Sequence, residues 1–309
     1  QPNVTAYGAT TVAAFTLQVF AGMWINAFIV SVLCIAWVKK KTLNSNEKIL
    51  LLLGSSRFWY LCFSWVYSFI SIIYPNCLLV HPIIQLLQGA YSFFNCSNFW
   101  FSASLCVFYC IKIANFSNSF FFYLKVKIDR IVPWLLLGTE ICSLVIGILV
   151  YNIIDKAVCK NLNFTCKGRF WKANIRIEEH FYILNFVTGF VYTTSFMAVI
   201  FSAVFLLCSL WRHKCKMQTN NMNSLSVDAH IKAMKSILSF FIMYCINFMF
   251  FILTLIYSTK KQKHVMFPAY LIQHAFPGVH SLILILSNPK LEKTLLRILC
   301  CVKCKICMR

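Results

Sequence analysis

Charged residues are scarce in this chain, and acidic ones are especially few. Only 12% of the 309 residues are charged and only 8 are Asp or Glu, whereas a soluble domain carries about a quarter charged residues. With 9 Gly and 7 Pro, the composition also excludes a collagen-like chain. The sequence has no His-Glu-x-x-His, no Gly-x-Ser-x-Gly and no phosphate-binding glycine loop. We therefore predict neither an enzyme nor a bound metal or cofactor.

Apolar residues, by contrast, make up 60% of the chain and are concentrated in seven long runs. Each run can cross about 30 Å of hydrocarbon, which needs about 20 helical residues. Helices satisfy their own backbone groups in lipid, and the runs lack the alternation of barrel strands. We predict an all-α membrane protein, a seven-transmembrane helix bundle at residues 12–288, preceded by segment 1–11 and followed by tail 289–309. The predicted spans are Val12–Val38, Ile49–Tyr74, Ile84–Ile111, Ile131–Ile154, Phe181–Trp211, Ser236–Tyr257 and Val265–Ser287.

The basic residues predict how the bundle is oriented. The connections after helices one, three and five, together with the tail, hold 19 Lys and Arg, against 9 in the other connections. Because Lys and Arg gather on the cytoplasmic side, we predict a multi-pass plasma-membrane protein with an extracellular N-terminus and a cytoplasmic C-terminus. Contacts with anionic lipid headgroups then explain the net charge of +21 without a nucleic-acid partner.

The predicted outer side carries two kinds of modification signal. Asn3 and Asn163 each begin an Asn-x-Thr sequon and are candidate glycosylation sites. Cys159 and Cys166, in the connection after helix four, are placed to close a small loop by a disulfide, with Cys77 as a competing partner.

Polar residues inside the spans are candidates for function, because each is costly in lipid unless it is paired. Arg57 in helix two is the remaining basic residue, and Asn26 in helix one and His280-Ser281 in helix seven reach a similar depth. We expect Arg57 to bond polar groups of helices one and seven. Such a network either rearranges on activation or acts as a static packing contact. A transporter or channel is a second reading, although the odd helix number and the lack of an internal repeat argue against it.

The tail combines thiols with basic residues. Residues Lys290–Leu299 predict a short amphipathic helix on the inner membrane surface. The thiols that follow are candidates for S-palmitoylation beside a basic patch, with unmodified thiols and a zinc knuckle as alternatives. These are Cys300, Cys301, Cys304 and Cys307.

Aromatic and amide side chains follow one another at helical spacing in the outer half of helix three. They either line a ligand cavity, which is usually apolar with a few polar groups, or pack helix against helix. The residues are Tyr91, Phe94, Asn95 and Asn98.

Longer strings at the inner ends of the helices carry a family resemblance. Residues 105–117 read Leu-Cys-Val-Phe-Tyr-Cys-Ile-Lys-Ile-Ala-Asn-Phe-Ser, which is similar to the pattern Leu-x-x-Phe-Tyr-x-x-Lys-Ile-Ala-Asn-Phe-Ser of the bitter taste receptors. Residues 280–291 read His-Ser-Leu-Ile-Leu-Ile-Leu-Ser-Asn-Pro-Lys-Leu, similar to that family's His-Ser-x-Ile-Leu-Ile-x-x-Asn-x-Lys-Leu. No Asp/Glu-Arg-Tyr follows helix three, unlike in rhodopsin-like receptors. The chain thus resembles the type 2 (bitter) taste receptors, with vomeronasal type 1 receptors as the nearest alternative.

The resemblance implies a G-protein-coupled receptor for small, chemically diverse bitter molecules. It implies signalling through a gustducin-type or inhibitory G-protein α-subunit to phospholipase C and calcium release. It places ligands in the outer half, between helices three, five, six and seven.

By position, Asn95 matches the family's ligand-lining Asn, and Tyr270 matches a pocket position that is often polar. Tyr91 stands where a Trp is common, Ser195 where many members have Pro, and Asn247 where many have Tyr. These departures leave the agonist and the activation switch open. The inner ends are implied to contact the α-subunit through Tyr109, Lys112, Ile113, His213 and Lys216.

Overall fold

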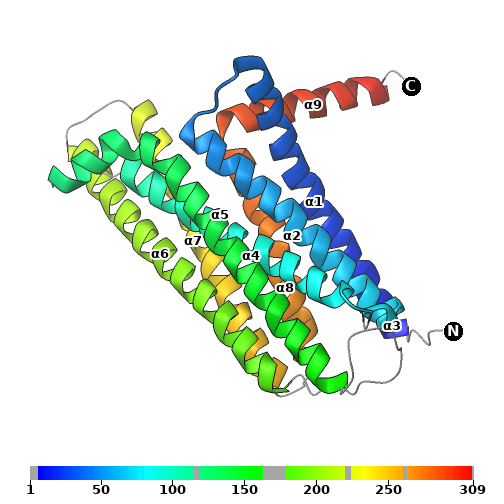
Figure 1. Ribbon diagram of the computed structural model, residues 1–309. Helices are drawn as coiled ribbons and strands as arrows, with labels where there is room; N and C mark the ends of the chain where they lie inside the picture. Colours follow the sequence, from blue (N-terminus) through cyan, green and yellow to red (C-terminus); the bar gives the residue numbers. More distant parts are fainter. Residues whose placement is uncertain are drawn as a thin grey trace.

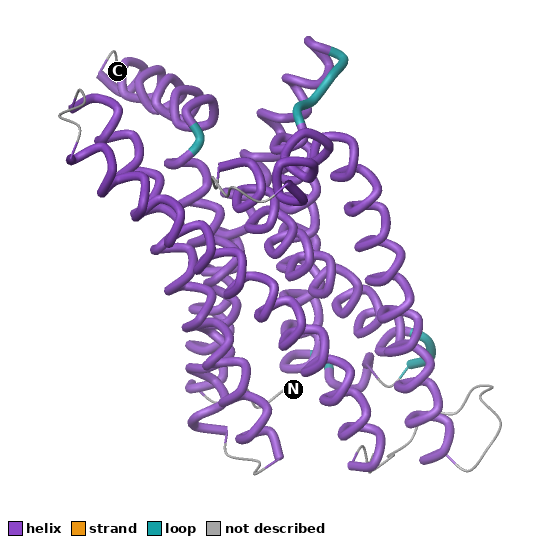
Figure 2. The backbone as a smooth tube through the Cα atoms, turned by 90° about the vertical axis from the view of Figure 1, so that its left-hand side faces the viewer, coloured by secondary structure: helices purple, strands orange, loops and turns teal. Residues whose placement is uncertain are grey.

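Seven long helices lie side by side and form the body of the protein (Figures 1 and 2). The computed structural model describes residues 6–78, 80–113, 119–162, 178–219, 224–259 and 263–307, and these residues are helical apart from short connections. The long helices are α1 (Ala6–Lys40), α2 (Ser45–Ile73), α4 (Ile83–Ile113), α5 (Ser119–Leu162), α6 (Glu178–Thr219), α7 (Ser224–Thr259) and α8 (Lys263–Ser287). A single helical turn, α3 (Pro75–Leu78), follows α2, and α9 (Pro289–Cys307) ends the described chain. The predicted seven-helix bundle with a further short helix after the seventh span is confirmed.

The surface of the bundle is apolar and its interior holds polar groups. Leu17, Trp24 and Phe186 are each at least three-quarters exposed, whereas Asn26 and Arg57 are completely buried. Six helices are long and apolar enough to cross a membrane, and α7 contributes the shorter apolar stretch Leu238–Thr254 within its described residues. Exposing this much apolar surface to water would cost free energy, whereas contact with lipid tails does not. The exposure pattern therefore indicates a membrane protein.

Helices α5, α6 and α7 extend well beyond the spans predicted from the sequence, and α7 begins at Ser224 where the predicted span began at Ser236. The predicted fourth span began at Ile131, whereas α5 begins at Ser119 and runs for 44 residues, and α6 runs for 42. At 1.5 Å per residue, 44 residues cover about 66 Å, roughly twice the hydrocarbon thickness. The apolar runs located the part of each helix that crosses lipid. They could not locate its ends, because a helical backbone continues into polar sequence until a cap or turn stops it.

The helices pack in a closed ring with α4 near its centre. Helix α4 contacts α2, α5 and α6, and α8 contacts both α1 and α7. Small residues permit the closest approaches: Gly89 of α4 faces Gly147 of α5, and Gly22 of α1 faces Gly278 of α8. A Cβ built on Gly147 would lie 3.1 Å from the carbonyl oxygen of Gly89. Close backbone contact of this kind is a main source of helix association in lipid.

The two ends of the bundle differ. The start of α1 and the short helix α3 lie at one end, called here the N-terminal end, and α9 runs across the opposite end, the α9 end (Figure 1). Asn288 separates α8 from α9: its side-chain Oδ1 accepts hydrogen bonds from the backbone N–H groups of Lys290 (3.1 Å) and Leu291 (3.4 Å). With Pro289 at the first helical position, this is a well-formed helix start.

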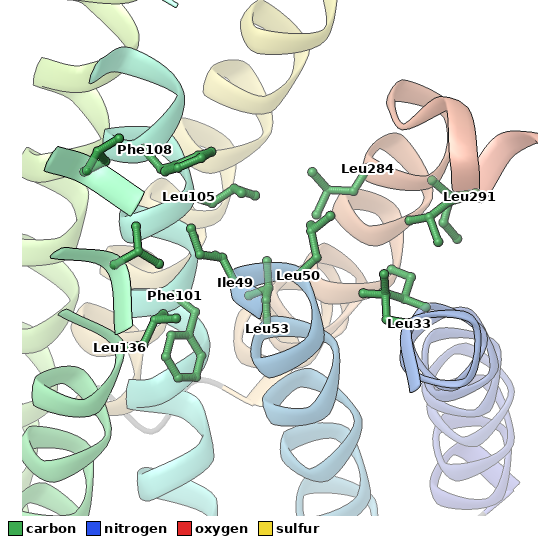
Figure 3. Close-up of a cluster of buried hydrophobic side chains, with 14 residues drawn as sticks. Leu33, Ile49, Leu50, Leu53, Phe101, Leu105, Phe108, Leu136, Leu284 and Leu291 are labelled. Atoms are coloured by element: carbon green, nitrogen blue, oxygen red, sulfur yellow. The ribbon is translucent and has the colours of Figure 1, made fainter. Parts of the chain in front are cut away.

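An apolar cluster at the α9 end holds α9 against the bundle (Figure 3). Leu291 of α9 is fully buried there and joins Leu33 of α1, Leu50 of α2 and Leu284 of α8. Farther along α9, Leu296 and Leu299 are exposed. Up to Cys301, the last residue whose side chain is described, the first turns of α9 are packed against protein and the later ones are exposed, which leaves their apolar residues for a membrane surface.

Candidate functional site

Arg57 of α2 is buried in the middle of the bundle and has hydrogen-bond partners on two other helices. Its Nε donates to Asn98 Oδ1 of α4 (2.9 Å), its Nη1 to Ser281 Oγ of α8 (2.8 Å), and its Nη2 to Ser102 Oγ of α4 (3.0 Å). Its Nη2 also contacts His280 Nδ1. A guanidinium only donates hydrogen bonds, so His280 must be neutral with its proton on Nε2. We call Arg57 and its four partners, together with Asn26, the Arg57 network.

The sequence predicted bonds from Arg57 to helices one and seven, and the structure corrects one of these. Helix α8, the seventh span, is a direct partner through Ser281 and His280. Helix α1 is reached only through Ser281, whose hydroxyl donates to Asn26 Oδ1 at 2.7 Å. The contacts with α4 were not expected, because Asn98 had been assigned to the ligand cavity. A buried cation needs several acceptors at once, and α4 supplies two of them.

A second polar group lies between α4, α6 and α7 and contains three of the predicted ligand residues. Asn95 is hydrogen-bonded to Tyr192 Oη of α6 at 3.3 Å, and the Tyr192 ring stacks on Phe251 of α7 with centroids 3.7 Å apart. Ser195 Oγ donates to the Tyr192 carbonyl (3.0 Å) and accepts from Tyr244 Oη of α7 (3.4 Å). We call these residues, with Asn247, the α4–α6–α7 cluster.

Asn247 is the member of this cluster with an unused hydrogen-bonding group. It lies three residues after Tyr244 and four before Phe251, and therefore on the same face of α7. Only 3% of it is exposed, yet its side-chain Oδ1 has no hydrogen-bond partner among the described residues. A buried amide oxygen without a partner costs about 1–3 kcal/mol, so a donor that reaches it gains that free energy.

Apart from Asn98, the remaining predicted ligand residues contact α2 instead. Tyr91 is bonded to Tyr60 Oη of α2 (3.4 Å), which also contacts His274 Nε2 of α8 (3.1 Å). Tyr270 Oη lies between Ser64 Oγ (3.0 Å) and Ser68 Oγ (3.1 Å) of α2. We call these residues the tyrosine network. Phe94 stacks on Phe63 of α2. The structure thus divides the predicted ligand set between partners on α6 and α7 and partners on α2, and Asn98 belongs to the Arg57 network.

Sequence reasoning missed Tyr60, Tyr192, Tyr244 and His274, which join the predicted residues to one another. Each is a polar aromatic residue inside an apolar run, and that is a detectable signal. The sequence has 13 Tyr, however, and those at a lipid interface look the same as those in the interior.

At the α9 end, side chains from four helices form polar contacts. Tyr109 Oη of α4 donates to Asn46 Oδ1 of α2 (3.1 Å), and Lys112 forms an ion pair with Asp129 of α5 (2.5 Å). Ile113 is exposed. The side chains of His213 and Lys216 lie outside the described residues.

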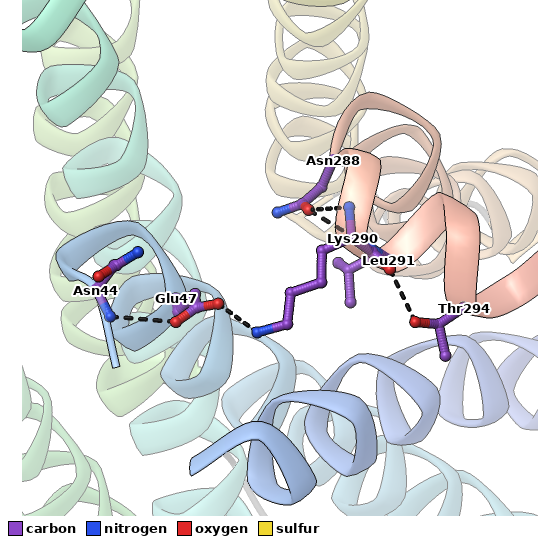
Figure 4. Close-up of polar contacts among 6 residues, drawn as sticks. All are labelled: Asn44, Glu47, Asn288, Lys290, Leu291 and Thr294. Atoms are coloured by element: carbon purple, nitrogen blue, oxygen red, sulfur yellow. Dashed lines mark hydrogen bonds and ion pairs between the residues drawn. The ribbon is translucent and has the colours of Figure 1, made fainter. Parts of the chain in front are cut away.

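Helix α9 is joined to α2 by a further ion pair (Figure 4). Lys290 donates to one carboxylate oxygen of Glu47, and the other accepts from the backbone N–H of Asn44 at 3.1 Å. Farther along α9, Cys300 and Cys301 are exposed thiols. The side chains of Cys304 and Cys307, and residues Asn3 and Asn163, are outside the part of the chain that the structure describes.

Comparisons with known proteins agree over almost the whole chain. The family model for Taste receptor protein (TAS2R) matches residues 4–303. The human protein named Taste receptor type 2 member 2 is 31% identical over 293 residues, covering 92% of this chain and 93% of that protein. Taste receptor type 2 member 41 of Mus musculus is 32% identical over 291 residues, with the same coverage. These matches confirm the resemblance seen in the sequence. The chain belongs to the type 2 taste receptor family, the bitter taste receptors among the G-protein-coupled receptors.

Proposed function

We propose that this protein binds small bitter-tasting molecules at the α4–α6–α7 cluster and passes the signal to a heterotrimeric G protein at the α9 end. The α-subunit is of the gustducin or inhibitory type, and the pathway continues to phospholipase C and calcium release. The observation that carries the proposal is the buried Oδ1 of Asn247, without a partner among the described residues, on the face of α7 whose Tyr244 and Phe251 contact Ser195 and Tyr192.

The cluster has the chemistry of a small-molecule site. Stacked rings, Tyr192 on Phe251 and Phe196 on Phe248, provide apolar walls, and Asn95 and Asn247 provide amide groups. Such sites are mostly apolar with a few polar groups that fix orientation. In the conformation described here, Tyr192 lies against both Phe99 and Phe251. An agonist with an N–H or O–H donor would bond Asn247 and insert where these rings now meet.

Signalling follows from a difference in affinity between two conformations. The cluster joins α4, α6 and α7, and Phe240 of α7 contacts the His280 ring of the Arg57 network with centroids 4.3 Å apart. A ligand that separates α7 from α4 and α6 therefore also acts on the Arg57 network. To shift the equilibrium towards the active conformation, the agonist must bind that conformation more tightly than the inactive one.

The contacts at the α9 end favour the conformation described here. The pairs Lys290–Glu47 and Lys112–Asp129 hold α9 to α2 and α4 to α5. Both are partly exposed, so each contributes at most about 1 kcal/mol. We propose that G-protein binding competes with the pair formed by Lys112, with Tyr109 and Ile113 beside it. His213 and Lys216, in the α6 segment of the chain, are further proposed partners of the α-subunit.

The proposed orientation puts the N-terminal end outside the cell and the α9 end in the cytoplasm. It is supported by the 19 Lys and Arg assigned to the inner side and by α9, whose later turns expose Leu296, Ile298 and Leu299. Cys300 and Cys301 are exposed on this helix and are proposed palmitoylation sites. Glycosylation at Asn3 or Asn163 requires the same orientation.

The test is intracellular calcium in cells that express this chain with a promiscuous G-protein α-subunit. A panel of bitter compounds is applied, and the half-maximal concentration of each active compound is measured. Asn247→Ala is expected to raise that concentration about tenfold, the equivalent of one hydrogen bond of about 1.4 kcal/mol. Asn152→Ala, an exposed amide on α5, is the matched control and should leave it unchanged.

Surface expression of every variant is measured in parallel. A receptor that responds equally well with Ala at Asn95 and Asn247 does not bind its agonist at the α4–α6–α7 cluster. A chain that reaches the surface and moves labelled solute without any G protein would instead be a transporter.

A further inference from the structure

A separate cavity lies near the N-terminal end, between α1, α2 and α8. Its volume is about 150 Å³. Four of its nine lining residues are aromatic, namely Phe15 from α1, Trp65 and Phe69 from α2, and Tyr270 from α8, and Thr16, Ser68 and Ser71 add hydroxyls. The α4–α6–α7 cluster is made by other helices, so this cavity is a different place in the bundle. Of its lining residues only Tyr270 is among the predicted ligand residues, and the function proposed above does not use the cavity.

The walls of this cavity are held in place by their own contacts. Trp65 Nε1 donates to Thr16 Oγ1 at 3.1 Å, and the Trp65 ring stacks on Phe69 with centroids 5.2 Å apart. Phe15 contacts the Tyr270 ring, also at 5.2 Å. The cavity is therefore preformed, and a ligand would not have to order these side chains when it binds.

The size and lining of the cavity specify its ligand. An apolar cavity of 150 Å³ in another protein is known to hold benzene, so this one fits a single aromatic ring. The Tyr270 hydroxyl lies between Ser64 and Ser68, and each of these hydroxyls has one donor and two acceptor positions. The two hydrogen bonds among Ser64, Ser68 and Tyr270 do not use all of these donor and acceptor positions. A remaining position can therefore bond a hydroxyl on the ligand. We propose that this cavity is an accessory binding site for a single-ring aromatic alcohol of about the size of phenol.

The cavity is connected to the centre of the bundle through the tyrosine network. The Tyr270 ring lies against His274 with centroids 3.9 Å apart, and His274 contacts Tyr60 Oη, which is bonded to Tyr91 of α4. A ligand that fixes Tyr270 therefore favours one arrangement of α2, α4 and α8. The binding step does not depend on the receptor activity, whereas modulation of an agonist response rests on the proposed function.

Binding is tested by the melting temperature of the purified full chain with increasing phenol. At a phenol concentration about tenfold above the dissociation constant, we expect a saturable rise of about 3 °C. Val12→Phe places a ring in the cavity from α1 and should abolish the rise. Leu17→Phe, on the same helix but facing away from the protein, is the matched control and should retain it. Ser71→Phe fills the cavity from α2 and is the second test if the first variant does not fold.

Size selectivity separates the site from partition into detergent. 2,6-Di-tert-butylphenol carries the same hydroxyl but is too large for the cavity and should give no saturable rise. The proposal is overturned if the wild type shows no saturable shift with phenol, if a folded cavity-filled variant keeps it, or if the bulky phenol reproduces it. A phenol shift that obeys these controls in a chain without any calcium response would retain the site and reject the proposed receptor function.

Discussion

Replacing Arg57 by Lys tests whether the shape of the guanidinium, and not only its charge, holds the bundle together. The insertion costs of Arg and Lys at the centre of a membrane helix fall in the same range, about 2.5–3.5 kcal/mol, so the exchange leaves the burial cost almost unchanged. Arg57→Ala is a less clean test, because it removes that cost together with the hydrogen bonds, and the two effects have opposite signs.

The magnitude follows from the partners of the side chain. Three guanidinium nitrogens contact four groups, on Asn98, Ser102, His280 and Ser281. A lysine has one nitrogen and cannot reach all of these positions, so we expect about two contacts to be lost. Hydrogen bonds between membrane helices contribute about 0.6–1.7 kcal/mol each, which gives a loss of about 1–3 kcal/mol. At about 2–4 °C for each kcal/mol, the melting temperature should fall by roughly 5 °C.

The assay is thermal unfolding of the purified receptor in detergent, with Arg130→Lys as the control. Arg130 lies on α5 with its side chain exposed, so the same exchange there should change the melting temperature by less than about 1 °C. If Arg57→Lys also melts within about 1 °C of the wild type, the fork-shaped contacts with α4 and α8 do not stabilise the bundle.

Three further predictions address other parts of the molecule. Gly147→Ala places a Cβ 3.1 Å from the Gly89 carbonyl oxygen and should destabilise the receptor by about 1–3 kcal/mol. Gly138→Ala, with no atom within 4 Å of its Cβ, is the control and should not destabilise it. Equal melting temperatures of the two variants would reject close α4–α5 packing. Glu47→Gln weakens the Lys290–Glu47 ion pair and should raise agonist-free calcium signalling by up to about fivefold, the equivalent of about 1 kcal/mol. An unchanged basal signal at equal surface expression would show that this ion pair does not restrain the receptor. Replacing Cys300 and Cys301 by Ser should remove much of the hydroxylamine-sensitive palmitate label, and full labelling of the double variant would exclude these two thiols.

The fold was predictable because lipid imposes strong rules on sequence. A run such as Val12–Val38 can satisfy its backbone in a membrane only as a helix, so the seven spans follow from composition and length. Helix ends such as Ser119 of α5 do not follow, because no apolar boundary marks them. The start of α9 could be predicted from the sequence, since Asn288 followed by Pro289 is a strong N-cap signal.

The candidate sites were predictable residue by residue but not as groups. Polarity inside an apolar run singled out Arg57 and Asn95, the family resemblance added Asn247, and all three are buried. Their partners depend on how each helix is rotated and how deep it lies, which the pattern of apolar residues leaves open when helices are apolar on all sides. For this reason Asn98, one turn from Asn95, was assigned to the ligand cavity although it bonds Arg57.

The most direct test of the central claim is agonist-stimulated nucleotide exchange on a purified G-protein α-subunit, with this receptor reconstituted alone in lipid nanodiscs. The agonist is taken from the calcium screen, and Asn247→Ala and Asn152→Ala are run beside the wild type. We predict that the agonist accelerates exchange in the wild type and in Asn152→Ala, and that Asn247→Ala needs about tenfold more agonist. Agonist that binds the reconstituted wild type without accelerating exchange would contradict the proposed coupling.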